Sequence, residues 1–318
     1  MDRRAETRED ARTRASSRLA KPELSNRARE RLAGYLFVAP DAIGLLVFVG
    51  GPMALSLTLG FFSVSGFGEY SFVGIDNYRR MAADPLFWKS LSVTVIYIVT
   101  LVPSLYAVGL GLALLVQDDT RFNGVVRTLL FMPQTVSLVV VGLVWQVLLI
   151  DKIGLFYQLA SWLDLPAVSW LGDPRFTLYT VTAVSVWFLM GFYMLIFLGG
   201  LQDIPREYYE AARIDGAGPV QSFFKITLPL LQPTSFFVLI VSTVAAVCGS
   251  QTFDLVYVMT KGGPANSTSL AIFYIYQQAF LFNEYGYAAA MASVLVVALM
   301  AITVLMFMLT RGGRFIYD

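Results

Sequence analysis

Residues 203–229 read DIPREYYEAARIDGAGPVQSFFKITLP, a charged and helix-prone stretch between two long apolar runs. Asp203 can cap the start of a helix, and Pro205 suits a first helical turn, where its missing N–H costs little. Gly216 can adopt the positive φ that ends a helix, and Pro219 suits the first position of a second helix. The stretch therefore predicts a helix–turn–helix that projects from the apolar part of the chain.

The first of these two helices has one face suited to contact with another protein. Glu207, Glu210 and Ala211 lie together on it, because residues three and four apart are neighbours on a helix. Ala211 and Ala212 are small, so a partner could approach the backbone closely there. An ordinary cytoplasmic loop is the alternative interpretation of a charged segment between apolar runs.

The composition is that of a membrane protein. Of the 318 residues, 57% are hydrophobic and 14% charged, and the mean hydropathy is +0.65, whereas soluble chains carry about 25% charged residues. The net charge of +1 argues against binding to nucleic acid. With no histidine and the single cysteine Cys248, the chain cannot build a Cys/His zinc site, an internal disulfide or a Cys–His nucleophile pair.

Long apolar runs set the fold class. A helix needs about 20 residues to cross the hydrocarbon core, and the runs that meet this length predict an all-α integral membrane protein with about six transmembrane helices. They are Gly34–Phe62, Phe87–Val116, Val125–Ile150, Thr177–Gly200, Leu231–Val258 and Tyr287–Leu309. Leu270–Phe282 is also apolar, but it would reach only about 20 Å as a helix. We expect it to form a short interfacial or half-inserted helix.

The N-terminal residues differ from the rest of the chain. Met1–Arg31 is rich in Arg and Glu, which predicts a cytoplasmic and largely disordered tail before a transmembrane domain over residues 32–318. Lys and Arg concentrate on the cytoplasmic side of membrane proteins. An even number of spans then places Arg311 and Arg314 on the same side as the tail. We expect a multi-pass protein of the cell membrane with both termini in the cytoplasm.

Polar residues within the apolar runs are candidates for a substrate pathway, since unpaired polar groups are costly in hydrocarbon. The residues are Gln134, Ser185, Tyr193, Ser250, Gln251, Thr252 and Asp254. Each has a plainer alternative: serine can bond back to its own helix, glutamine can join two helices, and Asp254 can reach water at the end of its span.

One spacing in residues 203–229 is distinctive: Glu210-Ala211-Ala212, then three residues, Gly216, nine residues and Ile226-Thr227-Leu228-Pro229. It resembles the EAA loop of ABC-importer permeases, which is the segment that such a permease lays into a groove of its ATPase. Asp215-Gly216-Ala217 has the form typical of sugar permeases of the maltose type, and the resemblance extends from about Tyr35 to Arg314. It implies ATPase-coupling roles for Glu207, Glu210, Ala211, Ala212, Asp215, Gly216, Ile226, Leu228 and Pro229. It also implies that residues 203–229 face the cytoplasm.

The resemblance further implies partners and a mechanism. Two permease chains, this one and a second, different chain, would form the channel in the lipid, with an ATPase dimer beneath and an extracytoplasmic solute-binding protein that delivers a sugar. The chain has no GxxxxGK[ST] phosphate loop, so we expect no enzymatic site and no cofactor here, with ATP and Mg²⁺ bound by the ATPase. Glycerol phosphate esters are an alternative substrate. An ion-coupled secondary transporter is the alternative of a different class, and a membrane enzyme is a third.

Overall fold

The computed structural model describes residues 23–64, 68, 70–164, 166 and 168–309. The chain divides into two compact units, residues 1–58 and 59–318. Most of the tail expected at residues 1–31 lies outside the described residues, as do Arg311 and Arg314. The described part is almost entirely helical, which confirms the predicted all-α class.

The described part of the first unit is one helical rod with a short irregularity. It consists of α2 (Glu23–Leu45), the π-turn η1 (Leu46–Gly50) and α3 (Gly51–Leu59). The N–H of Gly51 bonds to the carbonyl of Leu46, five residues back, directly before Pro52, which has no N–H to donate. Residues 34–59 are long and apolar enough to cross a membrane.

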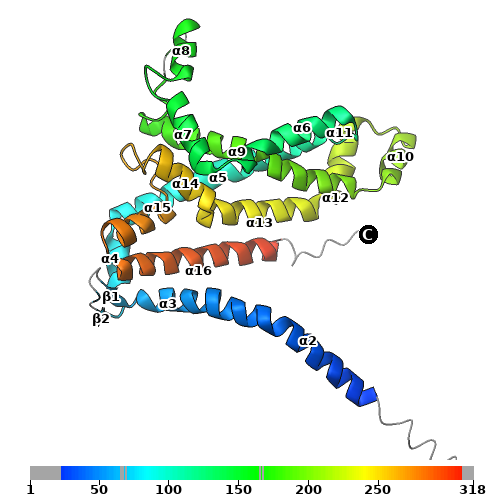
Figure 1. Ribbon diagram of the computed structural model, residues 1–318. Helices are drawn as coiled ribbons and strands as arrows, with labels where there is room; N and C mark the ends of the chain where they lie inside the picture. The colour runs from blue at the N-terminus through cyan, green and yellow to red at the C-terminus, as the bar shows by residue number, and fades with distance from the viewer. Residues whose placement is uncertain (1–22, 65–67, 69, 165, 167, 310–318) are drawn as a thin grey trace, which may run out of the picture. The chain divides into compact units, whose positions relative to one another are not determined.

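The second unit contains the remaining elements (Figure 1). Its short elements are β1 (Phe62–Val64) and β2 (Tyr70–Phe72), which pair antiparallel, α4 (Asp76–Ala83), α8 (Leu155–Trp162), α15 (Ala271–Tyr276) and the π-turn η4 (Gln277–Leu281). Its long helices are α5 (Pro85–Leu115), α9 (Pro174–Gln202) and α16 (Tyr285–Leu309). Its broken helices are α6 (Arg121–Phe131), η2 (Met132–Thr135) and α7 (Leu138–Leu148), then α13 (Gln232–Cys248) and α14 (Ser250–Met259).

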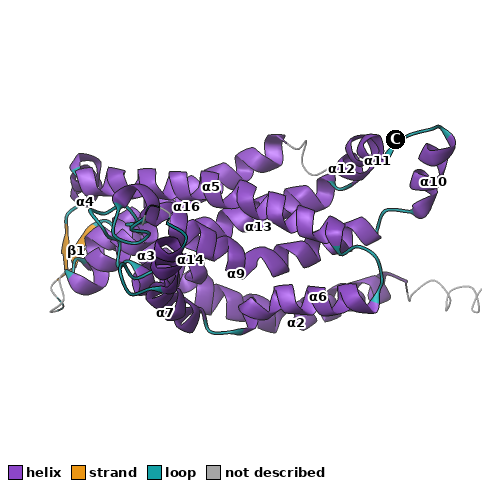
Figure 2. Ribbon diagram, turned by 90° about the horizontal axis from the view of Figure 1, so that it is seen from above, coloured by secondary structure: helices purple, strands orange, loops and turns teal. Residues whose placement is uncertain are grey.

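The core of this unit lies between α5, α9 and α13, which run side by side (Figures 1 and 2). Tyr97 and Leu105 of α5 and Tyr193 and Phe197 of α9 are among its fully buried side chains. A Cβ atom on Gly109 would lie 3.0 Å from the Cβ of Tyr193. Glycine at this position therefore allows the two long helices to approach closely.

Two of the predicted spans are broken, not continuous. The helices on either side of Val136 and Ser137 meet at 94°, so Val125–Ile150 is not one straight helix. The run Leu231–Val258 is interrupted at Gly249, whose extended backbone (φ −66°, ψ 136°) separates α13 from α14. Pro133 begins the first break, because it leaves a carbonyl without its helical donor. Four described helices are long and apolar enough to span. Up to six segments qualify when two bent pairs each count once, Arg121–Thr135 with Leu138–Leu148 (94°) and Pro219–Leu230 with Gln232–Cys248 (65°).

The apolar run at 270–282 is as short as predicted. It forms α15 and η4, which together cover Ala271–Leu281 before α16 begins at Tyr285. The loop before it, residues 260–270, is held by the hydroxyl of Thr268, which lies 2.7 Å from the hydroxyl of Thr260 and donates to the carbonyl of Gly263 at 2.8 Å. The short helix is thereby fixed against the end of α14.

Candidate functional site

The predicted helix–turn–helix is present, with one correction at its start. The first helix, α10, covers Arg206–Ile214, and its N-cap residue is Pro205. Asp203 is not the cap: it ends α9, and its N–H bonds to the carbonyl of Gly199. The prediction was wrong because α9 continues to Gln202, which leaves Asp203 in a helical conformation (φ −75°, ψ −13°).

The turn after α10 has the geometry that the sequence predicts. Gly216 has φ +79°. The N–H of Ala217 bonds to the carbonyl of Ala212 at 2.8 Å, and the N–H of Gly216 bonds to that of Arg213 at 3.1 Å. These two bonds form a Schellman motif, which satisfies the last carbonyls of the helix.

The second arm of the loop leads into the broken span through a bend. Pro219 begins α11 (Pro219–Ser222), which continues through the π-turn η3 (Phe223–Thr227) and α12 (Leu228–Leu230). At Leu231 the chain bends by 65° and enters α13. The hydroxyls of Tyr209 and Thr227 lie 2.9 Å apart and form a hydrogen bond between the two arms. Sequence reasoning missed this contact, because nothing in the local pattern pairs residues 18 positions apart.

Most of the predicted coupling residues are accessible. Figures 1 and 2 place α10 beyond the ends of α9 and α13. The exposed residues are Glu207, Glu210, Ala211, Asp215, Gly216 and Pro229, whereas Ile226 and Leu228 are half-buried and Ala212 is buried. Ile214 is 87% exposed and Val220 71% exposed. Both aliphatic side chains are therefore available for contact with another protein.

A cavity of about 840 Å³ lies behind the helix–turn–helix. Arg206, Glu210 and Arg213 line one part of it, and Gln117 and Asp118, at the end of α5, line another. Arg127 closes this end of α5, because its guanidinium donates to the carbonyls of Val116 (2.7 and 3.0 Å), Gln117 (3.4 Å) and Asp118 (3.0 Å). Cations are favourable at a helix C-terminus.

Of the predicted pathway residues, Gln134 has the most unusual environment. It lies in η2, where the first broken span bends. Its Oε1 atom is buried and has no hydrogen-bond partner among the described residues. This bend packs on Gly191 of α9, where any side chain would collide with the carbonyl oxygen of Leu130. A buried amide oxygen without a donor is costly, which is the property expected of a group that awaits a ligand or a partner chain.

Ser185 and Tyr193 of α9 lie in the core. Ser185 is within 2.8 Å of the hydroxyl of Tyr97 and donates to the carbonyl of Val181 at 2.9 Å. Tyr193 is 1% exposed. The plainer alternative that the sequence left open, a serine bonded back to its own helix, describes Ser185 in this chain.

The remaining pathway residues begin α14, directly after the break at Gly249. Ser250 is exposed, Gln251 and Asp254 are half-buried, and Thr252 is buried. Thr252 donates to the carbonyl of Ala245 at 3.1 Å, across the break. The structure therefore brings this group together on one short helix, and Gln134 and Ser185 lie on other elements.

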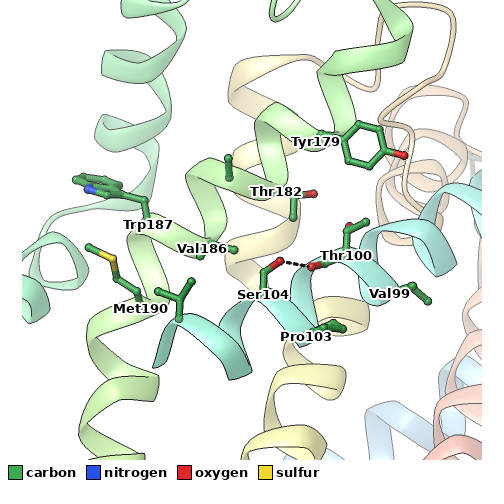
Figure 3. A pocket seen from close by; sticks show the side chains of 11 residues that line it. Val99, Thr100, Pro103, Ser104, Tyr179, Thr182, Val186, Trp187 and Met190 are labelled. Carbon is green, nitrogen blue, oxygen red and sulfur yellow. Dashed lines mark hydrogen bonds between the residues drawn. The ribbon is translucent and has the colours of Figure 1, made fainter. Parts of the chain in front are cut away.

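A further hollow of about 670 Å³ lies between α5 and α9, and Trp187 of the fourth predicted span lines it, whereas Gln134, Ser185, Tyr193 and the residues of α14 do not. Figure 3 shows Thr100, Ser104 and Thr182 along it. All three hydroxyls donate back to their own helices, to Ile96 (2.8 Å), Thr100 (2.6 Å) and Leu178 (2.8 Å) respectively. The hollow therefore offers a ligand few free donors.

Comparison with known proteins gives a consistent result. Residues 105–312 match the family described as "binding-protein-dependent transport system inner membrane component". The chain is 37% identical to a probable ABC transporter permease protein, YesP, of Bacillus subtilis, over 88% of this chain and 90% of that protein. It is 36% identical to the sulfoquinovosyl glycerol transport system permease protein SmoG of Agrobacterium fabrum, over 86% and 89% of the two chains.

The fold also matches a solved structure. A chain in the crystal structure of a bacterial alginate ABC transporter, in complex with a periplasmic protein bound to an alginate pentasaccharide, superposes with a TM-score of 0.78. The match covers 91% of this chain and 98% of the other, at 21% sequence identity. At this identity the likeness concerns the arrangement of helices.

Proposed function

Because the chain belongs to the family of binding-protein-dependent transport system inner membrane components, we propose that it is the permease subunit of an ABC importer that carries a sugar across the cell membrane. The observation that carries this proposal is the exposed helix–turn–helix at residues 203–229. Its shape is fixed by the Schellman motif at Gly216, and its exposed Ile214 and Val220 leave a surface for a partner.

In this proposal the helix–turn–helix binds a separate ATPase subunit and transmits its motion. Glu210 pairs with a basic group of the ATPase, and Ile214 fills a hydrophobic groove on it. The bond between Tyr209 and Thr227 makes the two arms move together. Because α12 joins α13 at a 65° bend with only Leu231 between them, a displacement of α10 reaches the broken span that contains Gly249. Rigid-body movement of packed helices around such a break is a common form of alternating access.

The proposed partners follow from the same assignment. ATP and Mg²⁺ bind to an ATPase dimer, a second permease chain completes the channel, and an extracytoplasmic solute-binding protein delivers the substrate. The family description supports the binding protein. In this proposal residues 203–229 contact the ATPase and therefore lie on the cytoplasmic side. With an even number of spans, both termini lie on that side too, and the short helix 271–281 faces outwards.

Two observations support a sugar as substrate. The name of one relative, the lactose transport system permease protein LacF of Rhizobium radiobacter, 34% identical over 88% of this chain, refers to a neutral sugar. In addition, residues 91–115, 177–202, 232–259 and 285–309 contain no Lys or Arg, and a basic group would be expected in a pathway for small anions. Amide, hydroxyl and carboxylate groups at Gln134, Gln251, Ser250 and Asp254 can hydrogen-bond to a polyhydroxylated substrate.

The test is ATP-driven uptake in proteoliposomes that contain the complete transporter. Glu210→Lys and Gly216→Pro should leave membrane insertion intact and abolish uptake, because both alter the ATPase-binding surface. Lys89→Glu reverses an exposed charge near the start of α5, far along the chain from the loop, and serves as the control. Normal uptake by both loop variants would refute the coupling role. Uptake that requires an ion gradient and not ATP would support a secondary transporter instead.

A further inference from the structure

We propose that α14 and the short helix 271–281 form an outer sugar-binding station, which holds one uncharged sugar ring between the extracytoplasmic end of the channel and the helix break at Gly249. The inference rests on the proposed function and adds a site to it. Its ligand class is a polyhydroxylated ring with an apolar C–H face and no negative charge.

Aromatic side chains from both elements form a continuous surface, here called the aromatic strip: Phe253, Tyr257, Tyr276 and Phe280. The rings of Phe253 and Tyr257 stack at 5.6 Å with an interplanar angle of 21°. Tyr276 lies 5.0 Å from Phe253 and 5.7 Å from Tyr257. Phe280 continues the strip at 5.3 Å from Tyr276. The rings join two elements that the loop at 260–270 separates in sequence.

Part of the strip is open. Tyr257 is 43% and Phe280 64% exposed, and Phe253 and Tyr276 are half-buried. Aromatic faces carry partial negative charge and ring edges carry partial positive charge. The C–H groups on one face of a pyranose can therefore pack against Tyr257 or Phe280, as they do in mostly apolar ligand sites with a few polar groups.

Polar groups lie beside the strip at helical spacing. Ser250, Asp254 and Tyr257 are at positions i, i+4 and i+7 of α14, so they share one face of the helix. Asp254 is half-buried and forms no ion pair or hydrogen bond with the part of the chain that is described. A carboxylate is too costly to face lipid. The face of α14 that carries Asp254 must therefore contact water or a polar ligand. An aromatic belt that only anchors the helix at the membrane interface would not need a carboxylate on this face.

The carboxylate of Asp254 also determines which ligands can bind, according to their charge. It can accept hydrogen bonds from two hydroxyls of a sugar, and charged acceptors make the stronger hydrogen bonds. A carboxylate on the ligand would instead be repelled, and this repulsion grows where the surroundings are apolar. The station therefore favours a neutral ring over a uronate of the same size.

The experiment measures sugar binding directly. The complete transporter in lipid nanodiscs, without the binding protein, is studied by saturation-transfer NMR with methyl β-glucoside and with glucuronate as probes. We expect transfer to the C–H protons of methyl glucoside. Tyr257→Leu should weaken its apparent affinity about tenfold, the effect of losing one good aromatic contact. Tyr257→Phe keeps the ring and should bind like the wild type.

Two further variants make the result specific. Tyr179→Leu removes a tyrosine of similar exposure (54%) on α9, outside the strip, and should leave binding unchanged. Asp254→Asn should weaken methyl glucoside and strengthen glucuronate. The inference is overturned if the wild type binds neither probe, if Tyr257→Leu binds as the wild type does, or if glucuronate binds the wild type as well as methyl glucoside. Copurification of the ATPase is scored separately, and its failure would refute the proposed function instead.

Discussion

The hydroxyl of Tyr287 donates a hydrogen bond of 2.7 Å to the carboxylate of Asp84, 203 residues earlier in the chain. Tyr274 donates to the same oxygen at 2.7 Å, and the other oxygen accepts the N–H of Leu86 at 2.8 Å. A single side chain thus caps α5 and joins it to α15 and α16. The short helix that carries half of the aromatic strip is held in place by this carboxylate.

Stability should depend on the ionisation of Asp84. Partial burial raises the pKa of this carboxyl, but hydrogen bonds from Tyr287, Tyr274 and two backbone N–H groups together lower it below its ordinary value. A carboxyl with a lowered pKa stabilises the fold above its unfolded pKa of about 4, and this contribution is lost as pH falls through the folded value.

Asp84→Asn should therefore lower the melting temperature in detergent by about 2–6 °C at pH 7, because hydrogen bonds to a charged group are lost. The difference from the wild type should shrink as the pH is taken below about 4. Asp76→Asn removes an exposed carboxylate in an i,i+3 ion pair with Arg79 and should change little. Equal melting temperatures for Asp84→Asn and the wild type at pH 7 would contradict the role of Asp84.

The bend of the first broken span should depend on Gly191. A Cβ at this position would collide with the carbonyl oxygen of Leu130 and lie 2.6 Å from the Cα of Phe131, and backbone atoms cannot move aside cheaply. Gly191→Ala should destabilise the protein by about 1–3 kcal/mol, as overpacking does. Gly199→Ala on the same helix meets no atom within 4 Å and should be neutral or stabilising. Thermal unfolding in detergent distinguishes the two, and equal stability would show that the bend can shift.

Substitution of Gln134 should reduce transport without reducing the stability of the protein. Because its buried Oε1 has no partner, Gln134→Leu removes an unsatisfied group and should leave the melting temperature unchanged or higher. Uptake of the transported sugar should fall about tenfold, which corresponds to about 1.4 kcal/mol of lost binding. Gln146→Leu is the matched control, because Gln146 donates to the carbonyl of Met259 at 3.4 Å and should affect stability more than uptake. Unchanged uptake in Gln134→Leu would remove this residue from the pathway.

Local sequence predicted the features that depend on local chemistry. Hydrophobic length located α5, α9 and α16, and the preferences of Gly216 and Pro219 located the turn and the second arm of the loop. The cap at Pro205 was missed because it depends on where α9 ends. Pro133 marks a break in the first broken span, but its sequence does not predict the angle of 94°, because the bend packs against Gly191 of α9. The aromatic strip joins α14 to a helix beyond a loop, which only tertiary structure reveals.

Coupling should depend on the backbone conformation at Gly216. Its φ of +79° is a conformation that a residue with a Cβ rarely adopts, so Gly216→Ala strains the Schellman motif by about 1 kcal/mol or more. Gly218 has φ −76°, and a Cβ there meets no atom within 4 Å, so Gly218→Ala alters the same loop without strain.

We expect Gly216→Ala to insert in the membrane normally but to retain less ATPase during purification and to stimulate ATP hydrolysis less, while Gly218→Ala behaves as the wild type. The two variants should unfold within about 4 °C of each other, because about 1 kcal/mol of strain in an exposed turn changes the melting temperature of a chain this long only slightly. If Gly216→Ala retained the ATPase fully, the orientation of α10 would not be what the partner recognises. If both variants lost the ATPase, the result would instead indicate that the ATPase contacts the backbone of residues 216–218 directly.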